Sequence, residues 1–111
     1  MRHDAERIDD IREACRKLAE IVATGRDTFD ESWIVRDAAN YNLSILGEAL
    51  NRLSDEFISR NPQLPVRQAK SLRNRLQHEY WTADHDILWA TMTKDVQSLL
   101  SALETPDPGL T

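Results

Sequence analysis

Residues Ser32 to Phe57 carry apolar side chains on two helical stripes, a pattern that few folds can accommodate. One stripe repeats at three- and four-residue steps through Ile34, Ala38, Tyr41, Ile45 and Ala49, and the other through Leu43, Leu46, Leu50, Leu53 and Phe57. A helix that is apolar on two sides has to be covered on both. We therefore predict one long helix here, covered by other helices of the chain and by either another helix or a second subunit.

Three more helices are expected around this one. The first runs from about Asp4 to Ala23 and the second from Val66 to Glu79, after a loop that two prolines keep out of helix. The third begins after Thr82 or Asp84, both suitable caps, and continues to Leu103. The sequence thus predicts an all-α, antiparallel up-and-down four-helix bundle, with dimerisation expected from the doubly apolar helix.

Composition sets the limits of this prediction. The chain has 111 residues, which suits a single domain over residues 1–104 with a flexible tail over 105–111. Its three glycines and few β-branched clusters favour helix over strand. No apolar run is long enough to cross a bilayer, so no membrane partner is expected. The one cysteine, Cys15, lies on an apolar stripe, which predicts a packed thiol and fits a cytoplasmic protein. No residue grouping has metal-ligand spacing and no glycine-rich phosphate loop is present, so neither metal nor cofactor is predicted.

Positive charge is concentrated in one short segment. Residues 66–78 contain four basic side chains and no acidic one, and removing those four charges from a chain of formal net charge −5 leaves −9. A basic helix in an acidic protein is typical of a local anion site. The plain alternative is a solvated helix face, or one that pairs with acidic neighbours.

The same segment ends in the pattern R-x-x-x-x-H-x-Y, formed by Arg73, His78 and Tyr80. An arginine can hold a phosphate with a planar fork of donors, and a histidine exchanges protons near neutral pH. These are the minimum requirements for cutting a phosphodiester without a metal. Arg73 and His78 lie well apart around a regular helix, so both can reach one phosphate only if the helix ends or bends near His78, or if a partner subunit closes the cleft.

With the flanking residues, this pattern resembles a known family. The residues that carry the resemblance are Ile45 to Ala49, Leu64-Pro65, the run Arg73-Asn74-x-Leu76-x-His78-x-Tyr80, and Asp84 followed by Ile87 to Trp89. Together they resemble the HEPN superfamily and, within it, the HepT-like toxins that pair with a minimal nucleotidyltransferase antitoxin. The likeness extends from about Ile34 to Leu100. Val66 departs from it, because many relatives have an aromatic residue there.

The resemblance implies a homodimeric, metal-independent ribonuclease whose substrate is RNA. Arg73 and His78 would be catalytic, Arg73 on the scissile phosphate and His78 as general acid or base. Asn74 would orient the substrate or the histidine, and Lys70, Arg67 and Arg75 would complete the substrate-binding residues. Tyr80 would be the position to which the partner nucleotidyltransferase attaches AMP, which silences the toxin by placing an anion beside Arg73.

Two other interpretations of the same residues remain open. In one, the chain is a catalytically silent module that docks the nucleotidyltransferase, with Tyr80 as its modification target. In the other, it is a plain helical dimer, and His78 only satisfies the carbonyls at the end of a helix. His85 is expected to be solvated, and Trp33, Trp81 and Trp89 are expected in packing or at a dimer interface.

Overall fold

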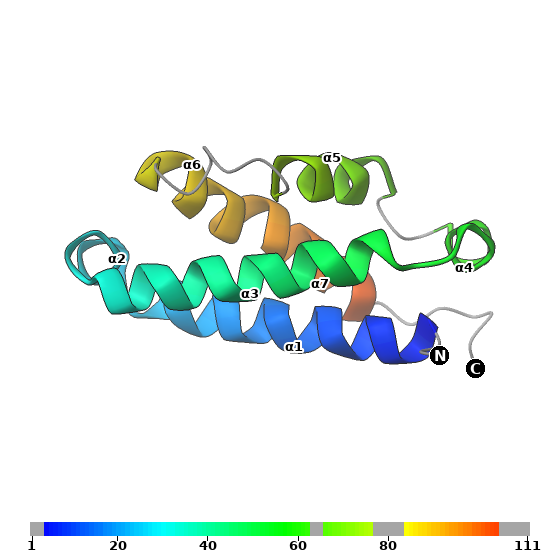
Figure 1. Ribbon diagram of the computed structural model, residues 1–111, viewed down its shortest axis with the longest axis horizontal. Coiled ribbons are helices and arrows are strands. Elements are labelled where there is room, and N and C mark those ends of the chain that lie inside the picture. The colour runs from blue at the N-terminus through cyan, green and yellow to red at the C-terminus, as the bar shows by residue number, and fades with distance from the viewer. Residues whose placement is uncertain (1–3, 63–65, 77–83, 105–111) are drawn as a thin grey trace.

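The computed structural model describes residues 4–62, 66–76 and 84–104, and all of their regular structure is helical. The long helices are α1 (Asp4–Ala23), α3 (Trp33–Asn51) and α5 (Val66–Leu76), followed by a continuous run of α6 (His85–Ala90), a π-helical turn η2 (Thr91–Asp95) and α7 (Val96–Glu104). Short helices α2 (Arg26–Glu31) and α4 (Asp55–Arg60) lie at opposite ends of α3. Consecutive long helices run in alternating directions (Figure 1).

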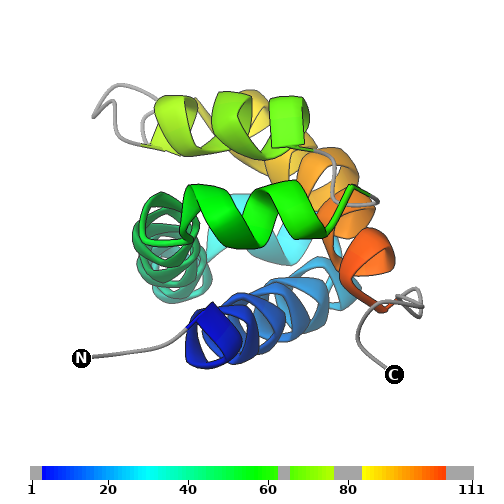
Figure 2. The same ribbon diagram turned by 90° about the vertical axis from the view of Figure 1, so that its right-hand side faces the viewer.

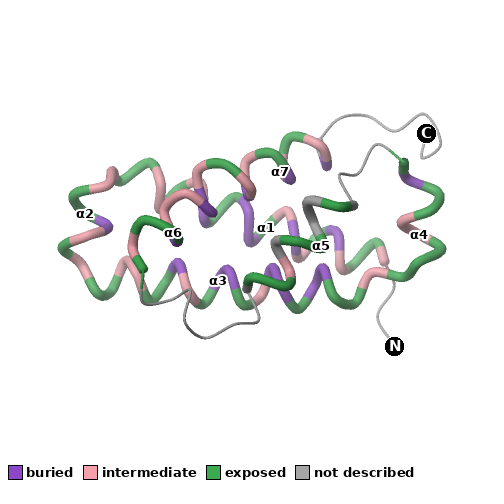
Figure 3. Tube along the Cα trace, turned by 90° about the horizontal axis from the view of Figure 1, so that it is seen from above, coloured by how far each residue is buried: buried purple, intermediate pink, exposed green. Residues whose placement is uncertain are grey.

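The helices enclose one core, which α1, α3, α5 and the run from α6 to α7 surround (Figure 2). Figure 3 shows that the buried residues of α1, α3 and α7 face inward, toward one another. The largest fully buried side chains are Phe29, Ile11, Leu18, Leu43, Leu46, Leu88, Met92, Val96 and Cys15. The prediction that Cys15 is a packed core thiol is therefore confirmed.

The predicted helix from Ser32 to Phe57 is wrong at its C-terminal end, because α3 stops at Asn51. Ser54 caps the next helix, with its hydroxyl accepting from the Phe57 N–H at 3.0 Å. The carboxylate of Asp4, at the start of α1, accepts from the N–H and the hydroxyl of Ser54 at 2.9 and 2.6 Å. This contact between distant parts of the chain stabilises a turn that apolar spacing alone does not reveal.

The two apolar stripes of α3 are buried to different extents. Leu43, Leu46 and Leu50 are buried, whereas the side chains of Ile34 and Tyr41 on the other stripe are 63% and 67% exposed. Trp33, at the start of α3, is 65% exposed. The chain therefore covers the outer stripe only toward the C-terminal end of α3, at Ile45 and Ala49, and the part around Ile34 and Tyr41 remains at the surface of the single chain.

The last predicted helix is confirmed, with Asp84 as its cap: the Asp84 carboxylate accepts from the Ile87 N–H at 3.1 Å. The π-helical turn in its middle was not predicted. There, the hydroxyls of Thr91 and Thr93 donate to the carbonyl oxygens of Ile87 and Trp89, at 2.8 and 2.9 Å. Such side-chain bonds compete for helix carbonyls and locally widen the turn.

Candidate functional site

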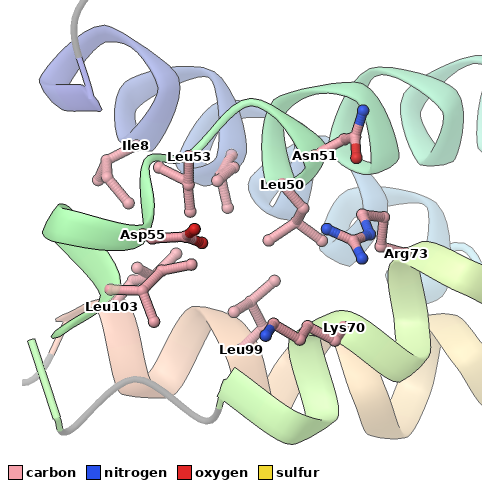
Figure 4. Close-up of a pocket in the computed structure, with 11 residues that line it drawn as sticks. Ile8, Leu50, Asn51, Leu53, Asp55, Lys70, Arg73, Leu99 and Leu103 are labelled. Atoms are coloured by element: carbon pink, nitrogen blue, oxygen red, sulfur yellow. The ribbon is translucent and has the colours of Figure 1, made fainter.

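The basic helix α5 lies over the C-terminal part of α3, with one side turned toward a pocket of about 120 Å³. Lys70 and Arg73 both line this pocket, and Figure 4 shows their head groups pointing into it. The side chain of Arg73 is half-buried and that of Lys70 is exposed. In the folded chain Lys70 therefore shares the pocket with Arg73.

The rest of the pocket is mostly aliphatic. Seven of its lining residues are isoleucines or leucines from four elements and the α3–α4 turn: Ile8, Ile11, Leu50, Leu53, Ile58, Leu99 and Leu103. Five of them, on α1, α3 and α7, also belong to the buried core. The pocket is therefore a cleft at the end of the core, with an apolar floor and cationic groups along the α5 side.

One carboxylate faces these cations. Asp55, in the first turn of α4, lines the pocket on the side opposite Lys70 and Arg73 (Figure 4). Within the described parts of the chain, no ion pair joins any of these three side chains to another residue. The pocket thus presents two positive charges on one wall and one negative charge on the other. A cation that lines an apolar cavity and forms no ion pair with a described residue is well placed to bind an anionic ligand.

The other basic residues of α5 point elsewhere. Arg75 forms an ion pair with Asp95 of the π-helical turn, which ties α5 to the final helical run. Arg67 and Asn74 are exposed and do not line the pocket. Of the predicted substrate-binding group, only Lys70 therefore lies together with Arg73.

Two central residues of the predicted site, His78 and Tyr80, lie outside the described residues, as do Trp81 and the predicted tail over 105–111. Of the two predicted catalytic residues, the structure therefore describes only Arg73, together with the pocket beside it. It resumes at Asp84, the cap of α6.

A second cluster of charged side chains joins α2 to α6, and the sequence did not predict it. The Arg26 guanidinium donates to both oxygens of Asp30 at 2.9 Å and to Asp86 at 2.6 Å. The hydrogen bonds from Arg26 lower the pKa of Asp30 below its ordinary value, and those with Asp86 and Asp30 raise the pKa of Arg26. His85, expected to be solvated, has its Nδ1 3.3 Å from Asp30.

Aromatic rings pack against the residues of this cluster. The buried ring of Phe29 contacts the rings of His85 and Trp89, with centroids 5.8 and 5.3 Å away, and the Arg26 guanidinium lies 5.8 Å from the Trp89 ring centroid. The expectation that Trp89 has a packing role is thus confirmed. The four-residue spacing of Arg26 and Asp30 was the one available signal in the sequence, because such pairs meet on a helix.

Within residues 4–62, 66–76 and 84–104, no group of three or more His, Cys, Asp or Glu side chains could hold a metal ion. In those same ranges, no helix is both long and apolar enough to cross a membrane.

Comparison with known proteins gives consistent results. Residues 11–105 match the family described as "Ribonuclease HepT-like". A "Putative RNase" of Caldanaerobacter subterraneus is 28% identical over 83% of each chain. A "Probable ribonuclease HepT" of Thermococcus cleftensis is 34% identical over 56% of each chain, and a "Putative RNase" of Methanocaldococcus jannaschii is 30% identical over 68% of this chain and 70% of its own. No solved structure gives a significant match.

Proposed function

Because the chain belongs to the ribonuclease HepT-like family, we propose that it is a metal-independent RNA endonuclease in which Arg73 and His78 are the catalytic residues. The observation that carries this proposal is the position of Arg73. Its guanidinium points into a pocket, half-buried, and has no ion-pair partner among the described residues. An arginine that only stabilised the fold would be expected to form an ion pair, as Arg75 does with Asp95.

In the proposed reaction the 2′ oxygen of a ribose attacks the neighbouring phosphorus. A bond forms between the 2′ oxygen and phosphorus, the bond from phosphorus to the 5′ oxygen breaks, and the products carry a cyclic phosphate and a 5′-hydroxyl. Arg73 binds the phosphate and stabilises the charge that develops on its oxygens. His78 acts as general base toward the 2′-hydroxyl or as general acid toward the departing oxygen, with water carrying the other proton. DNA lacks the attacking hydroxyl and is not cut.

Substrate binding is assigned to the basic face of α5. Lys70 shares the pocket with Arg73 and is the best-placed second cation, while Arg67 and Asn74 are exposed on the same helix and free to contact an RNA backbone. The ion pair of Arg75 with Asp95 favours a positioning role for Arg75, which holds α5 against the final helical run.

The biological setting is part of the same proposal. In it, the chain is a cytoplasmic toxin built as an up-and-down four-helix bundle, and a minimal nucleotidyltransferase antitoxin silences it by attaching AMP to Tyr80. The toxin forms a homodimer, for which the outer stripe of α3 around Ile34 and Tyr41 offers an exposed apolar surface. A second subunit on that stripe would give α3 the cover that its sequence pattern calls for.

The test is a cleavage assay on total RNA and tRNA with EDTA present, followed by analysis of the product ends. The unmodified protein is compared with His78→Ala and with His3→Ala, which removes a histidine outside the motif. We expect cleavage that survives EDTA, leaves cyclic phosphate, and is lost only in His78→Ala. A folded, dimeric, AMP-free protein that cuts no RNA would contradict the proposal and favour a silent module that docks the nucleotidyltransferase.

A further inference from the structure

The pocket beside Arg73 has cations on one wall, a carboxylate on the opposite wall and apolar side chains between them, an arrangement that phosphate binding alone does not require. Lys70 and Arg73 line the α5 side, Asp55 lines the α4 side, and aliphatic residues lie between them (Figure 4). A ligand that fits this arrangement has an anionic end, a flat or apolar middle, and a hydrogen-bond donor at the far end. A bare phosphate would leave the apolar floor and Asp55 unused.

We propose that this pocket binds an unpaired cytosine nucleotide of the RNA substrate, with its phosphate on Lys70 and Arg73 and its amino edge on Asp55. The inference rests on the proposed function, since it deepens the description of the same site. It goes further by assigning a base preference and a residue, Asp55, that the catalytic motif does not contain.

The size of the pocket favours a single ring. An engineered apolar cavity of about 150 Å³ accommodates benzene, so a pocket of about 120 Å³ accepts one six-membered ring and is tight for a purine. Its aliphatic walls, among them Leu50 and Leu99, can contact both faces of a pyrimidine and remove it from water.

The charge of Asp55 then selects between the pyrimidines. An ionised carboxylate only accepts hydrogen bonds, and the 4-amino group of cytosine donates them. Uracil carries a carbonyl oxygen at the same position, which a carboxylate repels. Because a base paired in a duplex cannot enter the pocket, the substrate has to be single-stranded or unstacked at this nucleotide.

The experiment separates binding from cleavage. Fluorescence anisotropy measures the affinity of the full-length chain for short oligo-deoxycytidylate and oligo-deoxyuridylate, which lack the attacking hydroxyl and are not cut. We expect wild-type protein to bind the cytosine strand about tenfold more tightly, in the range of one carboxylate–amine base contact. In Asp55→Asn the two affinities become equal, because an amide both donates and accepts.

Two further variants act as controls. Glu56→Gln makes the same charge change one residue along α4, on an exposed side chain that does not line the pocket, and keeps the tenfold preference. Ile58→Trp fills the pocket from a half-buried position and weakens binding of the cytosine strand toward that of the uracil strand. Circular dichroism and thermal melting establish that each variant is folded.

Each outcome separates this inference from the proposed function. Equal wild-type affinities, no binding of either strand, or a preference that survives in Asp55→Asn would overturn the cytosine assignment while leaving any observed RNA cleavage intact. A cytosine preference that depends on Asp55, in a protein that cuts no RNA, would uphold the pocket and reject the nuclease. Displacement of both strands by hexanoate, with no base preference, would instead assign the pocket to a small amphipathic anion.

Discussion

The two ends of the helical assembly differ in whether their charged side chains form ion pairs with one another. At the α2–α6 end, Arg26 bonds two carboxylates, and His85 and aromatic rings pack against the cluster. At the α4–α5 end, Lys70 and Arg73 face an apolar pocket, and no ion pair to them exists among the described residues. Satisfied charges hold elements together, whereas charges left facing a cavity are available to a ligand. We therefore expect substitutions at the first end to change stability and those at the second to change activity.

The largest effect on stability is expected from Phe29→Ala. Phe29 is fully buried and packs against His85 and Trp89, so its removal leaves a cavity beneath the charged cluster. The free energy of unfolding should fall by about 3–5 kcal/mol, as for other buried phenylalanines. Urea denaturation measures this, and Phe57→Ala, at a half-buried position, should cost clearly less. Equal losses would mean that the α2–α6 end is no better packed than α4.

Arg73→Ala should give the largest effect on activity. Loss of a group that stabilises transition-state charge lowers the rate by about 100-fold or more. The melting temperature should hardly change, because no described residue forms an ion pair with Arg73. The assay is RNA cleavage in EDTA with Arg60→Ala as control, since Arg60 is exposed on α4 and outside the pocket. A large loss of stability in Arg73→Ala would instead assign this arginine to the fold.

Much of the fold could be predicted from the sequence because its signals are local. Apolar spacing predicted the full length of α1, and the same spacing predicted a last helix that begins after Thr82 or Asp84, the second of which is the cap in the structure. Apolar spacing failed at Asn51, where α3 ends, because the turn depends on Asp4, fifty residues away. A hydrogen bond between residues far apart in the sequence does not alter the spacing of apolar residues, so apolar periodicity cannot predict it.

In the candidate site, too, local features could be predicted from the sequence and contacts between distant segments could not. The basic character of α5 follows from its residue types, and the order of the motif residues is what predicts a catalytic role for Arg73. The pocket does not, because Asp55 and the leucines that form it come from other helices and meet only in the folded chain. The pairing of Arg75 with Asp95 was likewise hidden, since a count of charges does not tell which of them are already neutralised.

A smaller effect is expected when pH is lowered. Hydrogen bonds from Arg26 lower the pKa of Asp30, so the ionised form of Asp30 is favoured in the folded state. The resulting stability is present above the pKa of Asp30 in the unfolded chain, about 3.9, and is lost as pH falls through the lower folded-state pKa. Asp30→Asn should therefore flatten the acid side of a plot of melting temperature against pH. Asp27→Asn, on the exposed side of the same helix, should leave its shape unchanged, and parallel curves for both variants would contradict the argument.

The smallest expected effect concerns Arg75 and Asp95, which are paired yet lie at the cationic end. Their side chains are 45% and 40% exposed, and pairs of this kind contribute about 0.2–1 kcal/mol. A double-mutant cycle with Arg75→Ala and Asp95→Ala should give a coupling energy in that range that decreases with added salt. The pair of Arg52 and Glu48, similarly exposed within one stretch of helix, is the reference cycle. If Asp95→Ala also raised RNA affinity, Arg75 would have to be counted with Lys70 and Arg73 as a charge that can bind ligand once its ion pair is broken.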